Sequence, residues 1–183
     1  MRSTALRSLI AVGLVTCAAA AHAQTPPPIK PGLWQVQSER EVDGQKARMP
    51  DMNEQMKNMP PEVRKQIEAM MKARGVDMSG GAGEMKICVT RELLDQGKWQ
   101  NEQGTCKTDY SSRSGSSWKW HTSCSEPVAE TDGEAIFAGP ENYTVKTVTK
   151  MIIQGEPKTS RMTLNSKWMG ADCGDVKPIN PRP

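Results

Sequence analysis

The chain has 183 residues, with 24 lysines and arginines against 21 acidic residues and a formal net charge of +3. A charge this small argues against nucleic acid or another strongly anionic macromolecule as a partner. The length fits one domain, and one phenylalanine, two tyrosines and five tryptophans predict a thin core that needs other supports.

The first 23 residues are typical of a secretory signal peptide. Arg2 and Arg7 give a positive start, residues 9–15 form an apolar stretch, and Ala21-His22-Ala23 is a small-residue cleavage site. We therefore expect cleavage after Ala23 and a periplasmic product of 160 residues, with 22 basic residues against 21 acidic ones. No later apolar run approaches the ~20 residues that a transmembrane helix needs.

The alternative for this segment is a lipid-modified Cys17. Thr16 stands where a glycine, alanine or serine is expected, and the alanine run continues past Cys17. The sequence therefore favours a cleaved signal peptide over a lipoprotein.

Four cysteines remain after cleavage, and an even number in an exported chain predicts two disulfides. We favour Cys106–Cys124 with Cys88–Cys173; the alternative is Cys88–Cys106 with Cys124–Cys173. A tetrathiolate metal site is disfavoured because the chain has no C-x-x-C pair.

In chain order, residues 24–31 are a proline-rich lead-in, and the main domain is expected over 32–175. Residues 33–40 alternate between apolar and polar side chains, which predicts a half-buried strand with Trp34 on its apolar side. Residues 176–183 carry three prolines and are expected to form a loose tail.

Residues 51–75 interrupt the strands with a methionine-rich helical pair. The first helix is predicted from the capping pattern at Asp51 and Glu54, and the second runs from about Pro61 to Arg74 before Gly75. An apolar stripe at helical spacing joins the two: Met56, Met59, Val63, Ile67, Met70 and Met71.

The stretch CKTDYSSRSGSSWKWHTSC, residues 106–124, is predicted to be a hairpin that turns at Gly115. Two-residue periodicity puts Tyr110, Trp118 and Trp120 on one face. Opposed residues share a face, so the pairs must join even positions to even positions. The predicted pairs are Ser112–Trp118, Tyr110–Trp120, Thr108–Thr122 and Cys106–Cys124.

Strands are also predicted at 84–90, 134–138, 143–153 and 158–169, with a short helix over 91–96. The fold class that follows is mainly β with a helical insertion: a single curved antiparallel meander of about seven strands, open or a half barrel. The Met-rich helical pair is expected to cover its apolar face, since otherwise the exposed patch is too large for a monomer.

Several motifs together resemble one family of exported bacterial proteins, domain-of-unknown-function family 3617. They are the opening Pro31-Gly32-Leu33-Trp34, Cys88-Val89-Thr90, Cys106, Cys124, Tyr143 and the closing stretch from Trp168 to Gly174. The resemblance covers residues 31–173. It implies an envelope location and the cysteine framework, and it implies no reaction or catalytic residue.

The sequence contains no constellation that predicts an enzyme. His121 is expected on the surface, away from the tryptophans, and it lacks the partners of a triad or a multi-histidine metal site. Glu39 and Glu41 share a strand face, and Glu130, Asp132 and Glu134 are expected to share a loop. Carboxylates spaced by two residues on exposed segments are more often solvating than catalytic.

The methionines are the one unusual chemical feature. Met49, Met52, Met56 and Met59 place thioethers three residues apart, and soft sulfur ligands select Cu(I). Methionine on an amphipathic stripe is more often a flexible apolar filler or an adaptable binding surface. We therefore predict no cofactor and keep copper as an alternative.

The predicted function is a non-catalytic binding or interaction module for an apolar, lipid-like ligand or an envelope protein. The alternatives are Met-mediated Cu(I) binding and a purely structural envelope protein. The expected ligand contacts are Trp34, Met56, Met59, Met70, Trp118, Trp120 and Leu164.

Overall fold

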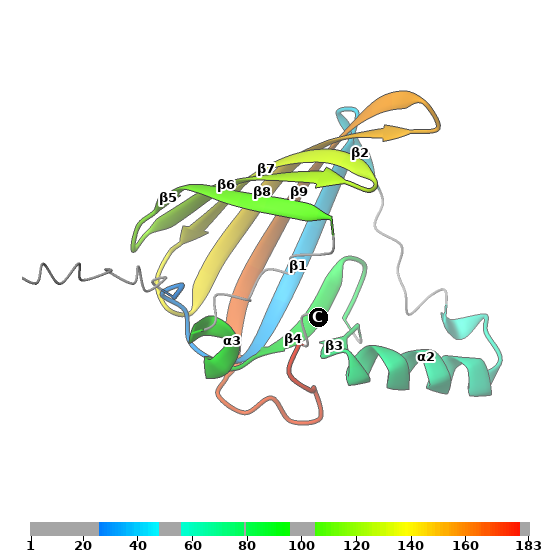
Figure 1. Ribbon diagram of the computed structural model, residues 1–183. Helices are drawn as coiled ribbons and strands as arrows, with labels where there is room; N and C mark the ends of the chain where they lie inside the picture. Colours follow the sequence, from blue (N-terminus) through cyan, green and yellow to red (C-terminus); the bar gives the residue numbers. More distant parts are fainter. Residues whose placement is uncertain (1–25, 48–55, 79, 96–104, 180–183) are drawn as a thin grey trace, which may run out of the picture.

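A computed structural model describes residues 26–47, 56–78, 80–95 and 105–179. One antiparallel sheet of nine strands dominates it (Figure 1), in the order β3-β4-β1-β9-β8-β7-β6-β5, with β2 paired to β1. The strands are β1 (Gly32–Val42), β2 (Gln45–Ala47), β3 (Val76–Asp77), β4 (Glu84–Val89), β5 (Cys106–Arg113), β6 (Ser117–Ser125), β7 (Val128–Phe137), β8 (Asn142–Ile153) and β9 (Glu156–Gly170).

The mainly β fold with a helical insertion is therefore confirmed, with nine strands where the sequence predicts about seven. The two additional strands, β2 and β3, are short. β2 follows the dipeptide Asp43-Gly44, whose φ angles of 51° and 80° are the positive values that a tight hairpin turn requires. β3 is a two-residue strand that pairs with β4.

The structure has two labelled helices, α2 (Pro61–Ala73) and α3 (Arg91–Asp95). α3 begins as the sequence predicts, because the Leu93 backbone N–H donates to the hydroxyl of Thr90 at 3.3 Å. Among the described residues, neither helix combines the length and apolar character that crossing a membrane would demand.

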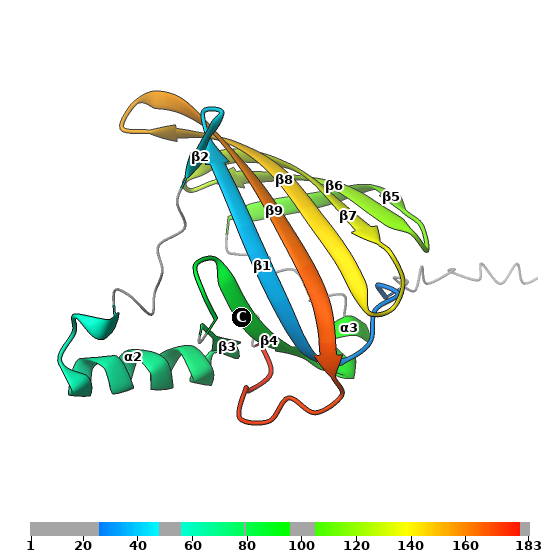
Figure 2. The same ribbon diagram turned by 180° about the vertical axis from the view of Figure 1, so that it is seen from behind.

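The sheet is twisted and curved, so that β5, β6 and β7 arch over β4 and α3 (Figures 1 and 2). We call the face toward α3 the inner face. Its buried core joins side chains from β1, β6, β7 and β8 to Leu94 of α3 and Ile29 of the lead-in. Trp34, Leu94 and Ala135 are 0% exposed.

Two disulfides support this core. Cys106–Cys124 joins β5 to β6, and Cys88–Cys173 joins β4 to the chain that follows β9. Both pairs are those that the sequence favours. Cys106 and Cys124 are direct cross-strand partners. Side chains alternate between the two faces along β6, so the bridge lies on the same face as Trp118 and Trp120.

The prediction that the Met-rich helical pair covers the apolar face of the sheet is wrong for α2. No α2 residue is buried, and Val63 and Met70 of its stripe are 42% and 48% exposed. α2 extends beside β3 and away from the inner face (Figures 1 and 2). The apolar surface that the prediction assigned to this helix is covered instead by α3, by Ile29 and by Ile179.

The segment predicted to be a loose tail lies against the sheet as far as Ile179. The Ile179 backbone N–H donates to the carbonyl of Cys88 at 3.0 Å, and Val176 is 7% exposed. Gly75 lies against this segment so closely that a Cβ there would come within 2.6 Å of the Lys177 and Ile179 backbone.

Gly133 is required by the indole of Trp120. A Cβ at Gly133 would lie 2.1–2.5 Å from three ring atoms of Trp120. We expect Gly133→Ala to lower the free energy of unfolding by about 1–3 kcal/mol, because the ring must shift within a packed core. Urea unfolding followed by tryptophan fluorescence measures this. Gly170→Ala, in a strand position with open space, is the control and should change stability little.

The two disulfides close chain segments of very different length, with sequence separations of 85 and 18. Loop-closure entropy predicts that removing Cys88–Cys173 by serine substitution costs about 4.5 kcal/mol and removing Cys106–Cys124 about 3 kcal/mol. Denaturant unfolding of the two double variants tests the order. A larger loss for the Cys106–Cys124 pair would contradict it.

Candidate functional site

The inner face can be mapped from the strand register, because cross-strand partners share a face. Four rows of cross-strand partners lie on this face, and each row is closer than the last to the β8–β9 hairpin turn. In order from the α3 side they are Arg113–Trp118–Ala135–Val145–Leu164–Ser38; Tyr110–Trp120–Gly133–Thr147–Met162–Arg40; Thr108–Thr122–Thr131–Thr149–Ser160–Val42; and Cys106–Cys124–Ala129–Met151–Lys158.

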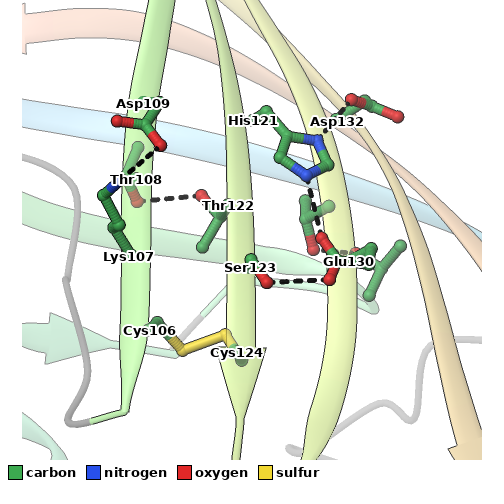
Figure 3. Close-up of polar contacts among 12 residues, drawn as sticks. Cys106, Lys107, Thr108, Asp109, His121, Thr122, Ser123, Cys124, Glu130 and Asp132 are labelled. Carbon is green, nitrogen blue, oxygen red and sulfur yellow. Dashed lines mark hydrogen bonds and ion pairs between the residues drawn. A yellow bond between two sulfur atoms is a disulfide. The ribbon is translucent and has the colours of Figure 1, made fainter.

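The third of these, which we call the hydroxyl row, consists of five hydroxyl side chains followed by Val42. The hydroxyls of Thr108 and Thr122 are 2.9 Å apart (Figure 3), and those of Thr131 and Thr149 are also 2.9 Å apart. At the β1 end, Arg40 Nε donates to Ser160 Oγ at 3.1 Å. The row therefore crosses five strands as a line of hydroxyl side chains.

The inner face divides along the second row, next to the hydroxyl row. On the α3 side the large aromatic side chains are a closed core, with Trp118 2% and Tyr143 7% exposed. From the second row onward, Thr147, Met162 and the four threonines of the hydroxyl row are half-buried. We call this half-buried region the open half of the inner face: Thr147, Met162 and Arg40 of the second row, and the two rows beyond it.

The structure separates the predicted ligand contacts into three groups. Trp34, Trp118 and Trp120 lie in the closed core. Leu164 packs against that core at the border of the open half. Met70 belongs to α2, away from the inner face, and Met56 and Met59 lie in the turn before it, so the structure does not bring these groups together.

The predicted copper ligands are only partly described. Met56 is 8% exposed, and its carbonyl accepts a hydrogen bond from Arg64 Nε at 3.0 Å. Met49 and Met52 lie outside the described residues, so the copper site stays a prediction. In the described part of the chain, no group of three or more His, Cys, Asp or Glu side chains is placed to hold a metal ion.

The outer face carries a cluster of charges over β6 and β7 (Figure 3). His121 Nδ1 lies 2.9 Å from Asp132 Oδ1, and His121 Nε2 lies 2.8 Å from Glu130 Oε2. Ser123 Oγ donates to Glu130 Oε1 at 2.7 Å, and Lys119 pairs with Glu134 at 3.4 Å. The expectation of a shared loop for the three carboxylates is wrong: all three are on β7, which begins at Val128 rather than at residue 134.

This outer cluster is not arranged as a nucleophilic site. A triad needs the serine hydroxyl bonded to the histidine, whereas Ser123 donates to Glu130 and both imidazole nitrogens meet carboxylates. The hydrogen bond to Asp132 raises the pKa of His121 above its ordinary value, and Glu130 adds to this. The two carboxylates of β7 therefore favour the protonated form of His121 on β6.

An open cavity of about 500 Å³ lies at the edge of β1. β4 pairs with β1 as far as Gln37 and β2 pairs from Arg40 onward, so Glu39 is left between two partner strands. The lining residues are Gln37, Ser38, Glu39, Arg40, Glu41, Lys46, Ala47, Ala82, Arg161 and Thr163. Sequence reasoning missed this site, although the Asp43-Gly44 turn signal was there to place β2.

Arg113 is the second feature that sequence reasoning missed. The predicted pair Ser112–Trp118 is wrong, because a register shift between Tyr110 and Ser112 sets Arg113 opposite Trp118. The guanidinium carbon of Arg113 lies 3.6 Å from the ring centre of Tyr110 and 5.0 Å from that of Trp118. The other three predicted pairs of this hairpin are confirmed.

Comparison with known proteins shows the family of this chain. The model of a family described as "Protein of unknown function (DUF3617)" matches residues 29–173. The chain belongs to this family. A relative from Pseudomonas putida, described as an uncharacterized protein in the lpd-3 5'region, is 31% identical over 144 residues, covering 75% of this chain and 95% of the relative. No solved structure matches.

The His121 cluster makes a prediction about pH. Because the folded-state pKa of His121 is raised, its contribution to stability is present below the unfolded value near 6.5 and is lost as pH rises through the higher folded pKa. We expect Asp132→Asn to lower the pKa of His121, measured by NMR titration of the imidazole protons. Asp109→Asn, which changes the cross-strand partner on β5, is the control and should lower it less.

Proposed function

We propose that this protein is an exported, non-catalytic binding module that takes an apolar or amphiphilic molecule on the open half of its inner face. The observation that carries the proposal is the split of the inner face into a closed aromatic core and a half-buried region lined by threonine, methionine and leucine. Sites for small molecules are concave and mostly apolar, with a few polar groups that orient the ligand.

Two further features support this proposal. The aromatic core, with Cys106–Cys124 at one side, makes a rigid wall that need not reorganise when a ligand binds. The residues of the second and third rows combine methyl groups and hydroxyls, which suits an alkyl chain next to a polar group. The signal-like start of the sequence and the two disulfides support export, with the periplasm as the proposed location.

The proposal can be tested on protein purified from the envelope without denaturant. Native mass spectrometry of the full-length, processed chain should show a co-purifying amphiphile of lipid-like mass that is released by organic solvent. A protein that carries no ligand and also fails to enhance the fluorescence of 1-N-phenylnaphthylamine, a neutral apolar probe, would favour the purely structural function.

A matched pair of variants tests whether the inner face is the site. Thr147 and Thr144 are both on β8, and Thr147 faces the inner row while Thr144 bonds Asn165 on the outer face. We expect Thr147→Asp to weaken probe binding about tenfold or more, because a carboxylate in an apolar site must be desolvated. Thr144→Asp should bind as the unchanged protein does. Equal weakening in both would contradict the inner face as the site.

A further inference from the structure

Few charged side chains lie on the inner face, and most of them are cations. The described strand positions of the inner face contain three cations, Arg40, Arg113 and Lys158, and one carboxylate, Glu156. Lys158 is paired with Glu156 at 3.2 Å and with Asp43 at 3.6 Å. Two arginines are left on this face, and no described carboxylate on the same face pairs with them.

Arg113 is held by aromatic rings. Its guanidinium lies over Tyr110 and within reach of Trp118, a cation–π arrangement that compensates part of the charge. Its Nε is buried and has no hydrogen-bond partner among the described residues. This side chain closes the core beside the β5–β6 turn, and we assign it a packing function.

Arg40 lies in a different environment. It is the β1 member of the second row, opposite Met162, and its Nε is bonded to Ser160 at the end of the hydroxyl row. Ser160 is itself only 9% exposed, so the hydrogen bond fixes the plane of the guanidinium. No described residue gives the terminal nitrogens of Arg40 an ion-pair partner.

Arg40 also lines the cavity of about 500 Å³ at the β1 edge, together with Lys46 and Arg161. Glu39, Glu41, Lys46 and Arg161 line the same cavity, but the register places all four on the outer face. Arg40 is therefore the inner-face cation at the border of this cavity. A planar guanidinium whose terminal nitrogens pair with no described carboxylate suits bidentate recognition of a carboxylate or phosphate.

We infer that the ligand of the inner face is an anionic amphiphile, whose carboxylate or phosphate group binds Arg40 beside Ser160 while its alkyl chain lies over Met162, Leu164 and Thr147. This inference rests on the proposed function and adds the class of ligand and its orientation. The hydroxyl row supplies further hydrogen-bond donors next to the anionic group, and the core side of the open half supplies the apolar surface.

The test compares three probes that differ in one property each: decyl phosphate, 1-decanol and inorganic phosphate. Binding is measured by displacement of 1-N-phenylnaphthylamine and by titration calorimetry on the full chain. We expect decyl phosphate to bind about 10- to 100-fold more tightly than decanol, the range typical of hydrogen bonds to a charged group. Inorganic phosphate should neither displace the probe nor bind measurably at the same concentrations.

Arg40→Gln should remove most of the preference for decyl phosphate and leave decanol binding unchanged. Lys146→Gln, an equal loss of charge at an exposed position of the outer face of β8, is the matched control and should keep the preference. Arg40→Lys should restore part of it, because charge returns without the bidentate fork. Ser160→Ala should reduce it by a smaller factor, and urea unfolding shows that each variant is folded.

The outcomes separate the inference from the proposed function. If decanol and the neutral probe bind but decyl phosphate binds no better, or if Arg40→Gln keeps the preference, the inference is wrong and the proposed function stands. If inorganic phosphate competes as well as decyl phosphate, the site takes a free anion and the inference is also wrong. If no alkyl probe binds, the proposed function fails and the inference fails with it.

Discussion

The alternation of side chains along paired strands is the constraint on which this structure depends. From β5 to β1 the register is continuous across five strand pairs, with irregularities only near Tyr110 and near Leu33. A slip by one residue in any of these pairs would move tryptophans to water and lysines to the core. The same continuity fixes the hydroxyl row, since five hydroxyls on five strands can align only when every intervening pair is in register.

Much of the hairpin could be predicted from the sequence because the residues that pair in it are close together in the chain. Even-numbered aromatics, the even-to-even pairing rule and two cysteines at equivalent distances from Gly115 together determine three of its four predicted pairs and one disulfide. The fourth pair failed because a bulge near Ser111 adds a residue to one strand. Nothing in the local pattern of Ser111 and Ser112 distinguishes a bulged serine from a paired one.

The parts that could not be predicted depend on contacts between distant segments. An amphipathic stripe on residues 61–73 shows that a helix has an apolar side, but it does not show which surface that side meets. In the structure the core is covered by Leu94 of α3, by Ile29 and by Ile179, which are isolated apolar residues in polar or proline-rich segments. Isolated apolar residues produce no periodic pattern in the sequence. The stripe on residues 61–73 was therefore the only pattern from which a cover for the sheet could be predicted.

The order β4-β1-β9 has a consequence for the Met-rich segment. β1 and β4 are antiparallel neighbours in the sheet. The chain between them, which includes β2, α2 and β3, is therefore one long connection between two adjacent strands. The entropic free-energy cost of closing a connection between two strands rises by only about 0.6 kcal/mol each time the length of the connection doubles. Chain entropy therefore sets only a weak limit on the length of this stretch, whereas strand pairing and two sulfur bridges hold the curved wall.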